Sequence, residues 1–278
     1  VNMPDFASSL ESIQLQRGVG TSTNGSGAFG ASLNMLTDNY SKVSSGEISN
    51  SAGSFNSRKN TVKFSTGLMN NQFEIAGRLS VLKSDGYIDR ASSDLKSYFL
   101  QGTYNNNGTL IKALAFGGHE KTYQSWFGLS QEEMDEDRRQ NPYTYENEID
   151  NYKQDHYQLH WNQKINQRWS TNLGLNYTFG RGYYEQYRAD DAVSTYGGIV
   201  EGTAVDDDGD PITDLIRRRW LDNDFYVINA TANYSESDLD LIFGGSYSTY
   251  DGDHFGEVIW ARQFASNSSI RDRYYFGN

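Results

Sequence analysis

The chain is dominated by long runs in which apolar and polar residues alternate. In residues 169–179, large apolar side chains take most of the odd positions, and Ser, Asn, Thr and Gly take the positions between. A period of two places successive side chains on opposite faces of a strand, so each run predicts a strand with one apolar face. The same pattern recurs over residues 61–68, 73–81, 98–104, 157–161, 226–234 and 241–249.

The length of these runs separates membrane strands from soluble ones. Several of them reach the ~9–11 residues that a tilted strand needs to cross a bilayer, whereas strands in soluble proteins average ~5–6 residues. Aromatic residues sit at the ends of the apolar faces, as Trp169 and Phe179 do, which is where membrane barrels place their interfacial girdles. Leu110 to Gly118 is less regular, because Lys112 shares a face with Leu114 and Phe116. The pattern predicts an antiparallel transmembrane β-barrel with roughly nine or ten strands.

The overall composition fits this prediction and excludes other classes. The mean hydropathy is −0.72 and no run approaches the ~18 consecutive apolar residues of a transmembrane helix, but the polar lumen-facing residues of a barrel dilute hydropathy in the same way. A net charge of −12 argues against a nucleic-acid partner, which requires a basic face. The chain has no Cys, so it has no disulfide framework and no thiolate metal site or nucleophile.

The connections between the predicted strands alternate between short and long. Tight turns of Asn, Gly, Asp and Ser are expected at residues 57–60, 70–71, 105–108, 166–168 and 236–238. Long connectors lie between them, at about residues 83–94, 121–152 and 184–222, and a last one begins at Asp251. Membrane barrels combine short periplasmic turns with long extracellular loops. The long connectors are therefore expected outside the cell, and every tight turn after that of the first hairpin, at residues 57–60, is expected inside.

Few groups of residues have the spacing of a chemical site. His156 and His160 have the spacing of zinc ligands on a helix, but on a strand they lie ~13 Å apart, so we expect lumen-facing hydrogen-bonding residues and no metal site. Asp206 to Asp210 resembles the opening of a calcium loop, although Pro211 replaces the expected Gly, which favours a solvated acidic turn. Ser130 to Glu133 predicts a capping box on a short helix within a loop. Because nothing resembles a nucleophile, phosphate-binding or Cys/His motif, we expect no enzyme and no cofactor.

The long connectors are rich in Tyr, Trp and Arg. Such side chains could pack the loops against one another, or could bind a planar, aromatic or anionic ligand. The sequence leaves both interpretations open. The aromatic and basic residues concerned are Tyr123, Trp126, Tyr143, Tyr145, Tyr183, Tyr184, Tyr187, Tyr196 and the run Arg217 to Trp220.

The stretch from Leu10 to Thr37 departs from the barrel pattern. One strand-like run ends at Arg17-Gly18, a Gly/Ser/Thr/Asn-rich stretch follows, and a second strand-like run covers residues 32–37. This arrangement resembles the last part of the plug domain of TonB-dependent outer-membrane receptors, with the pattern I-E-x-I-x-[VL]-x-R-G-P, a turn, Y-G and G-G-x-[IL]-N-[IM]-x-[ST]. The residues in register are Arg17, Gly18, Gly25, Gly30, Leu33, Asn34, Met35 and Thr37, and the departures are Val19 for Pro, Asn24 for Tyr and Ala31 for the second Gly.

The resemblance implies a fold and a function. Residues 1–38 would be the end of an internal plug domain, and residues 39–278 the first part of a transmembrane barrel that continues beyond this chain. It implies active transport of a scarce nutrient across the outer membrane of a Gram-negative bacterium, with a ferric siderophore or similar metal chelate as the favoured cargo. The expected partners are outer-membrane lipid, an extracellular ligand and the energy-transducing TonB protein, whose docking segment would lie upstream of Val1.

The resemblance also directs attention to particular residues. Asn24 takes the place of a Tyr that the family presents to its ligand, and Trp126, Tyr184 and Tyr187 are the loop aromatics expected in the same binding site. Arg17, Gly18 and Asn34 are expected to serve plug structure and transport, with Arg17 pairing with a carboxylate of the barrel wall.

A second hypothesis comes from a different functional class. A soluble or surface-anchored carbohydrate-binding β protein would also alternate apolar and polar residues and would carry aromatic platforms. In such a protein the apolar face of the sheet would have to be covered by a core.

Overall fold

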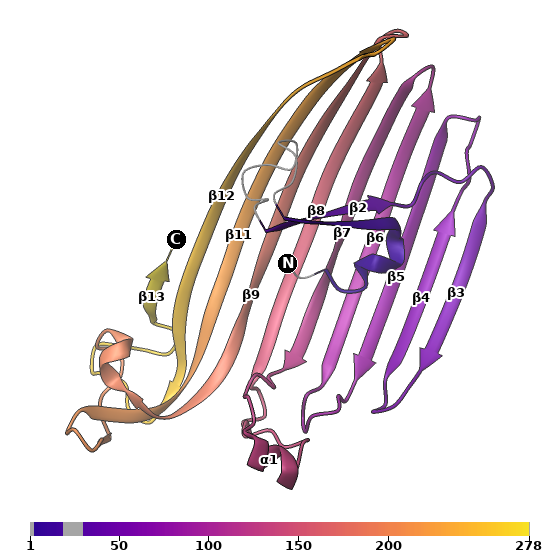
Figure 1. Ribbon diagram of the computed structural model, residues 1–278. Helices are drawn as coiled ribbons and strands as arrows, with labels where there is room; N and C mark the ends of the chain where they lie inside the picture. Colours follow the sequence, from indigo (N-terminus) through magenta and orange to yellow (C-terminus); the bar gives the residue numbers. More distant parts are fainter. Residues whose placement is uncertain (1–2, 19–29, 278) are drawn as a thin grey trace.

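A computed structural model describes residues 3–18 and 30–277. Two sheets account for nearly all of the regular structure, and helical segments are short (Figure 1). The elements are η1 (Phe6–Ser9), β1 (Leu10–Arg17), β2 (Ala31–Thr37), β3 (Ser45–Ala52), β4 (Arg58–Ser65), β5 (Phe73–Ser84), β6 (Ser93–Asn106), β7 (Thr109–Tyr123), α1 (Gln131–Glu136), β8 (Ile149–Lys164), β9 (Trp169–Ala192), η3 (Val193–Tyr196), β10 (Ala204–Val205), β11 (Pro211–Glu236), β12 (Leu239–Ala261) and β13 (Arg273–Gly277).

The large sheet is an antiparallel meander. Strands β3 to β9 and then β11 to β13 pair in chain order, and β10 adds a short hairpin to β11. The sheet curves as a barrel wall does (Figure 1), and within the described residues it stays open, with β3 and β13 at its edges. The predicted barrel architecture and strand number are confirmed. No helix in the part of the chain that the structure describes is long and apolar enough to cross a membrane.

Strand register places the apolar positions of neighbouring strands side by side. Tyr157 lies opposite Tyr177, and Tyr177 opposite Tyr226, on β8, β9 and β11. Two residues further along, Leu159, Leu175 and Ile228 form the next row. All of these side chains project from the convex face. The N-terminal segment, residues 3–18 and 30–37, lies on the other face and is called the plug segment. It contacts wall residues of the opposite parity. Apolar side chains on the convex face remain exposed, which suits a surface in lipid.

Aromatic residues border this apolar face at both ends. The rings of Tyr177 and Tyr226 stack 4.8 Å apart on the side nearer the long loops. Trp169 and Tyr234 pair at 5.1 Å on the side of the tight turns. From Trp169 to Tyr177, β9 covers nine residues, which lies within the ~9–11 residues that a tilted strand needs to cross a bilayer.

The N-terminal segment crosses the concave face of the sheet. β1 and β2 form a separate two-stranded antiparallel sheet, and η1 lies between this small sheet and the wall (Figure 1). Phe6 packs against Phe99, Leu114 and Phe116, with its ring stacked 4.5 Å from that of Phe116. This contact explains the irregular alternation in β7. Leu114 and Phe116 face the lumen beside Lys112 because they receive the Phe6 side chain.

The loops are shorter and the strands longer than the sequence indicated. The connector expected over residues 184–222 contains the last third of β9 and the first half of β11, and β12 continues from Asp251 to Ala261. These segments carry polar residues on both faces, so alternation could not reveal them. They stay paired because Tyr196, Leu215 and Val258, all fully buried, form a core beyond the membrane level with the loop that follows β9.

The predicted helix and the turns predicted at residues 70–71, 105–108, 166–168 and 236–238 are confirmed. The turn predicted at residues 57–60 lies instead at residues 53–57, because Arg58 to Asn60 already belong to β4. Asn70 and Asn71 both have positive φ, 51° and 55°, as the two central residues of a hairpin turn require. α1 begins after Ser130, whose hydroxyl accepts from Glu133 N at 3.3 Å, while Ser130 N donates to Glu133 Oε2 at 2.7 Å. This reciprocal pair is a capping box.

The assignment of faces predicts different effects for neighbouring substitutions on β9. Leu175 lies in the lipid-facing row with Leu159 and Ile228, whereas Asn176 hydrogen-bonds with Gln158 and Thr178 on the lumen face. Leu175→Arg should reduce the free energy of folding into lipid by ~2–4 kcal/mol, because a cation would replace an apolar side chain near the bilayer midplane. Asn176→Arg should cost much less. The measurement is folding into lipid vesicles as a function of urea, and equal effects of the two substitutions would contradict the assignment.

Candidate functional site

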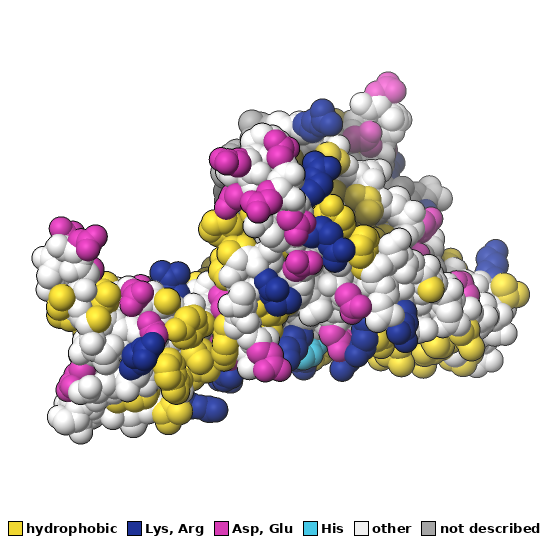
Figure 2. Space-filling view, turned by 90° about the horizontal axis from the view of Figure 1, so that it is seen from below, with side chains coloured by type: hydrophobic (Ala, Val, Ile, Leu, Met, Phe, Trp, Pro, Cys, Tyr) yellow, Lys and Arg dark blue, Asp and Glu magenta, His cyan; other side chains and the backbone are white. Residues whose placement is uncertain are grey.

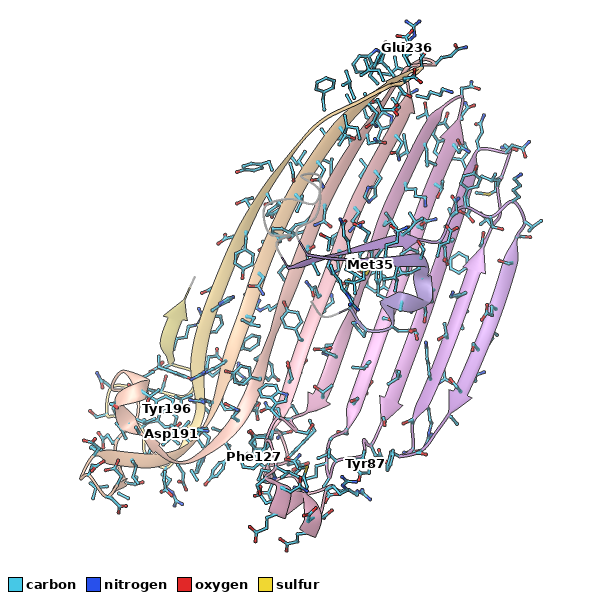
Figure 3. The ribbon with its side chains drawn as sticks, in the orientation of Figure 1. Met35, Tyr87, Phe127, Asp191, Tyr196 and Glu236 are labelled. Atoms are coloured by element: carbon cyan, nitrogen blue, oxygen red, sulfur yellow. The ribbon has the colours of Figure 1, made fainter. Side chains whose placement is uncertain are left out.

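The concave face of the wall holds a cavity beside the plug segment. It has a volume of about 830 Å³ and opens between the small sheet and strands β8, β9 and β11. Met35, labelled in Figure 3, borders it from β2 near the middle of the sheet. The wall contributes aromatic rings, amides, imidazoles, one guanidinium group and one carboxylate, that of Asp150 opposite Tyr184, so the cavity is apolar in bulk with polar groups at defined places. The wall residues that carry this chemistry are Asp150, Tyr152, His156, His160, Tyr184, Arg219, Asn223 and Tyr250, and Phe6 approaches from η1.

Arg219 is the guanidinium group of this cavity. Its Nη1 donates to Tyr184 Oη at 3.2 Å, and its Nε is buried without a hydrogen-bond partner among the described residues. Tyr184 in turn packs edge-on against Trp126 from the β7–β8 loop, with ring centroids 5.6 Å apart. The three side chains together present a cation and two aromatic rings at the loop end of the cavity, which suits a planar anion.

A second polar group lies deeper along β8, β11 and β12. Asn223 Nδ2 donates to Tyr152 Oη at 3.2 Å, and Asn223 Oδ1 accepts from Tyr250 Oη at 2.5 Å. His254 Nε2 lies 3.0 Å from the same Asn223 oxygen. These contacts hold two phenol groups at the cavity wall, where each retains capacity for a ligand hydrogen bond.

His156 and His160 line the cavity as lumen-facing residues, in agreement with the sequence. His156 Nδ1 lies 2.9 Å from Thr178 Oγ1, and its ring stacks on Phe116 at 4.6 Å. His160 Nε2 lies 3.1 Å from Gln158 Oε1. In the described ranges, no group of three or more His, Cys, Asp or Glu side chains is arranged to hold a metal ion.

The plug segment is tied to the wall by an ion pair beside the cavity. Asp5 Oδ2 lies 2.6 Å from Arg78 Nη1, and Asp5 Oδ1 lies 2.5 Å from Lys59 Nζ. Arg78 is almost fully buried, and it also donates to the Asp5 carbonyl oxygen. The loss of this carboxylate would leave a buried guanidinium group without its counter-charge, so the pair fixes the position of η1.

The outer ends of the strands carry a network of charged and phenolic groups. Glu185 accepts from Tyr145 Oη at 2.7 Å and from Arg218 Nε at 2.8 Å, and burial followed by the Glu185 hydrogen bond raises the pKa of Tyr145 to about 12. Tyr196 donates to Asp191 at 2.5 Å, and both lie at the loop end of the molecule (Figure 3). These contacts tie the β7–β8 loop and the segment after β9 to the outer ends of β9 and β11.

Glu148 is a buried carboxylate of this network. Its Oε2 accepts from the backbone N–H of Tyr187 at 3.0 Å, and its side chain is almost completely buried. Burial raises the pKa of Glu148 despite the Tyr187 hydrogen bond and the nearby arginines. The carboxyl group is therefore more readily protonated than an exposed glutamate.

The structure brings together two of the loop aromatics predicted for ligand binding. Trp126 and Tyr184 are in contact and Tyr184 lines the cavity, whereas Tyr187 lies outside it and donates to Asp214 Oδ2 at 2.9 Å. Asn24 lies outside the described residues. The ligand-binding role of all four residues stays a prediction.

The plug residues named from the sequence lie on the small sheet. Arg17 pairs with Ala31 in register and Asn34 with Gln14, and Gly18 has a positive φ of 82° that other residues rarely adopt. Arg17 forms no salt bridge within the residues described, and the observed bridge to the wall is that of Asp5. The role of Arg17 in transport stays a prediction.

The acidic run from Asp206 to Asp210 forms a tight hairpin turn. Asp206 Oδ1 accepts from the backbone N–H groups of Asp208 and Asp210 at 3.0 and 2.9 Å. β10 and the start of β11 pair on either side of it. The carboxylate of Asp206 is thus used to close the turn, as Asx residues commonly do.

Sequence reasoning missed Asp5 and did not separate Arg219 from its neighbours. Arg217 to Trp220 was noted only as a basic and aromatic run. Alternate side chains of β11 point to opposite faces, so Arg219 faces the lumen and Arg218 faces the outer side. The sequence could have shown this only if β11 had been known to extend back to Pro211. Asp5 lies next to Phe6 in a segment with no repeating pattern, so no sequence signal indicated its partners.

The raised pKa of Glu148 predicts a pH-dependent loop. A carboxyl group whose pKa is higher in the folded state contributes stability that is complete below its ordinary pKa and is lost as the pH rises through the folded value. Protection of the Tyr187 amide against hydrogen exchange, corrected for the intrinsic rate, should therefore decrease as the pH rises above the ordinary pKa of a glutamate and through the raised pKa of Glu148. Glu148→Gln should flatten this dependence, and Glu146→Gln, an exposed residue of the same loop, should leave it unchanged. Equal pH dependence in wild type and Glu148→Gln would contradict the prediction.

Comparison with known proteins gives similarity in structure only. No protein-family model matches the chain, and no curated protein sequence matches it. Among solved structures, the siderophore receptor PiuA from Acinetobacter baumannii has a TM-score of 0.70 at 12% identity, over 93% of this chain and 38% of that one. The ferric-catecholate import receptor Fiu from E. coli has a TM-score of 0.66 at 12% identity, over 97% and 42%. The ferric preacinetobactin receptor BauA from A. baumannii has a TM-score of 0.67 at 9% identity, over 96% and 41%.

These similarities establish the fold. The chain spans about 40% of the length of each of these receptors, which agrees with a sheet that is open at both edges. The resemblance to TonB-dependent receptors seen in the sequence is confirmed at the level of the fold. The chain therefore has the fold of the barrel wall and adjoining small sheet of an outer-membrane siderophore receptor.

Proposed function

We propose that this chain is part of a TonB-dependent outer-membrane receptor that takes up a ferric siderophore or similar metal chelate. The observation that carries the proposal is the cavity between the plug segment and the wall, with Arg219, Tyr184 and Trp126 at its loop end. In this proposal residues 1–38 are the end of the plug domain and residues 39–278 the first part of the barrel. The receptor fold of the structural neighbours supports it.

The side chains of the cavity match the chemistry of an iron chelate. Such ligands carry aromatic or carboxylate oxygens and often a net negative charge. Arg219 offers charge-assisted hydrogen bonds from a site largely shielded from water, where they are strong. The rings of Tyr184 and Trp126 offer faces for stacking, and the Tyr152 and Tyr250 hydroxyls can hydrogen-bond oxygen atoms deeper in the cavity.

The exposed convex face argues against the soluble alternative. A soluble carbohydrate-binding protein would cover its apolar face, but here Leu79, Phe243 and Tyr247 are exposed by 65, 57 and 69%. No element among the described residues packs over that face. A continuous apolar surface of this kind is suited to lipid.

The transport step requires movement of the plug segment. TonB would act on the plug from the periplasm, and the contacts that keep η1 on the wall are the Asp5 ion pairs and the Phe6 cluster. These contacts must be released before a ligand can pass along the wall beside them.

Arg219→Ala should weaken ligand binding. The loss of a charge-assisted hydrogen bond costs ~1.5–3 kcal/mol, so the dissociation constant should rise about tenfold or more. The measurement is binding of iron-55-labelled catecholate, hydroxamate and citrate chelates to cells that express the full protein. Arg181→Ala removes an arginine that is half exposed on the outer face, and it should leave binding unchanged. Unaltered affinity of Arg219→Ala for every chelate that the wild type binds would remove this residue from the site.

Asp5→Asn should loosen the plug without changing affinity. Lys59 and Arg78 would lose their carboxylate partner, so η1 would leave the wall more readily. We expect greater entry of a bulky antibiotic that the outer membrane normally excludes, with chelate binding nearly intact. The matched control is Asp38→Asn, an exposed aspartate of the same region whose side chain forms no salt bridge within the described part of the chain. The same antibiotic sensitivity in both variants would show that the Asp5 pair does not hold the plug.

A further inference from the structure

A hollow lies on the outer wall of the sheet, on the face opposite the plug. It has a volume of about 530 Å³ and spans strands β4 to β8 near their loop ends. On the strands, Ser84 and Ser93 have the other parity, but most lining residues share the parity of the lipid-facing apolar positions, so the hollow opens sideways from the barrel. Those lining residues are Arg58, Asn60, Val81, Lys83, Asp94 and Lys121, and Asp85 lines the hollow just beyond the end of β5. We call this feature the outer-wall hollow; the residues that the argument uses are Arg58, Val81, Lys83, Asp94, Lys121 and Tyr123.

Strand register places its charged residues in one row. Arg58 lies opposite Lys83, Lys83 opposite Asp94, and Asp94 opposite Lys121, on four consecutive strands. Like charges directly opposite each other destabilise a sheet, as Arg58 and Lys83 do here. Three cations and one carboxylate in a single row are unusual for a chain with a net charge of −12.

The single carboxylate of the row leaves two cations without an acidic partner. Lys83 Nζ lies 2.7 Å from Asp94 Oδ2. Within the described part of the chain, the Arg58 guanidinium group donates to the Asn56 side-chain oxygen, at 3.1 and 2.6 Å, and forms no salt bridge. Lys121 is exposed and forms no salt bridge within the residues described. Figure 2, viewed from the loop end, shows Lys and Arg side chains, with Asp and Glu side chains among them, along the lower edge of the molecule, which is the convex face.

The hollow lies at the level of lipid headgroups. Asp94 is four residues from Tyr98 on β6, ~13 Å along the strand. Tyr98 borders the apolar band, with Leu79 opposite it and Val62 opposite Leu79. Val81 belongs to the hollow, while Leu79 and Val62 continue the apolar surface below it, 65 and 47% exposed. The cations therefore stand directly above a surface on which acyl chains can pack.

We propose that the outer-wall hollow binds a phosphorylated glycolipid of the outer leaflet, of the lipid A class. The phosphate group would lie between Arg58 and Lys121, with Lys83 beside it, and the acyl chains would lie along Val81, Leu79 and Val62. This inference rests on the proposed outer-membrane location. A free anion is disfavoured, because the hollow opens onto an apolar surface that only an amphipathic ligand would cover. A phosphate also relieves the repulsion between Arg58 and Lys83.

The test uses the full protein in detergent with defined lipids. Native mass spectrometry would be titrated with bis-phosphorylated lipid A, with dephosphorylated lipid A and with inorganic pyrophosphate. Wild type should retain the bis-phosphorylated lipid preferentially. Each basic residue near an anionic lipid phosphate contributes about fivefold to binding, so Arg58→Ala with Lys121→Ala should weaken binding about 25-fold.

The control is Lys164→Ala with Lys42→Ala, which removes two exposed lysines outside the hollow, neither of which lies on the charged row. These substitutions should leave lipid binding unchanged, and neither pair should alter chelate binding. Equal affinity of wild type and the Arg58/Lys121 variant, or equal binding of the dephosphorylated lipid, would overturn the inference, as would a preference for pyrophosphate. Migration of the same samples on a gel, with and without heating, separates the lipid site from the proposed outer-membrane receptor. A folded barrel migrates differently before and after heating, so the absence of this difference would contradict the barrel, whereas its presence with no lipid binding would contradict only the lipid site.

Discussion

The hydrogen bonding of the backbone in lipid is the constraint on which this structure depends. A bilayer offers no water to unpaired N–H and C=O groups, so each strand must pair with neighbours on both sides along its whole membrane span. Among the described residues, β4 to β9 and β11 meet this requirement, whereas β3 has one neighbour and β12 has a second neighbour only over His254 to Glu257, where β13 pairs with it. Register then follows from the side chains. A slip of one residue would move Leu175 and its row into the lumen and Asn176 into lipid.

The two faces of this wall serve different partners, and each departure from simple alternation marks a contact. Leu114 and Phe116 are apolar on the lumen face because Phe6 packs on them, and Arg78 is buried there because Asp5 neutralises it. On the outer face, Arg58, Lys83 and Lys121 interrupt the apolar pattern just above the tyrosine border. The first set holds the plug segment beside the cavity, and the second set is where we infer a lipid phosphate.

The candidate site combines elements that are far apart in the sequence. Trp126 comes from the β7–β8 loop, Tyr184 from β9 and Arg219 from β11, and Met35 approaches from the small sheet. The network around Glu185, Glu148 and Asp191 holds the outer strand ends in place above the cavity. Tyr184, which lines the cavity, and Glu185, which holds the loop residue Tyr145, are neighbours on β9, so this strand connects the candidate site to the loop network.

Alternation and turn residues by themselves determined the membrane strands, their faces and the tight turns after the first hairpin, because these features depend on a period of two or on neighbouring residues. The capping box of α1 was also predictable, because it joins Ser130 and Glu133, only three residues apart in the sequence. The lengths of β9, β11 and β12 beyond the membrane, the partners of Asp5 and the separation of Arg219 from Arg218 were decided only by tertiary structure. The physical reason is that these segments are stabilised by contacts between distant parts of the chain, which leave no periodic pattern in the sequence.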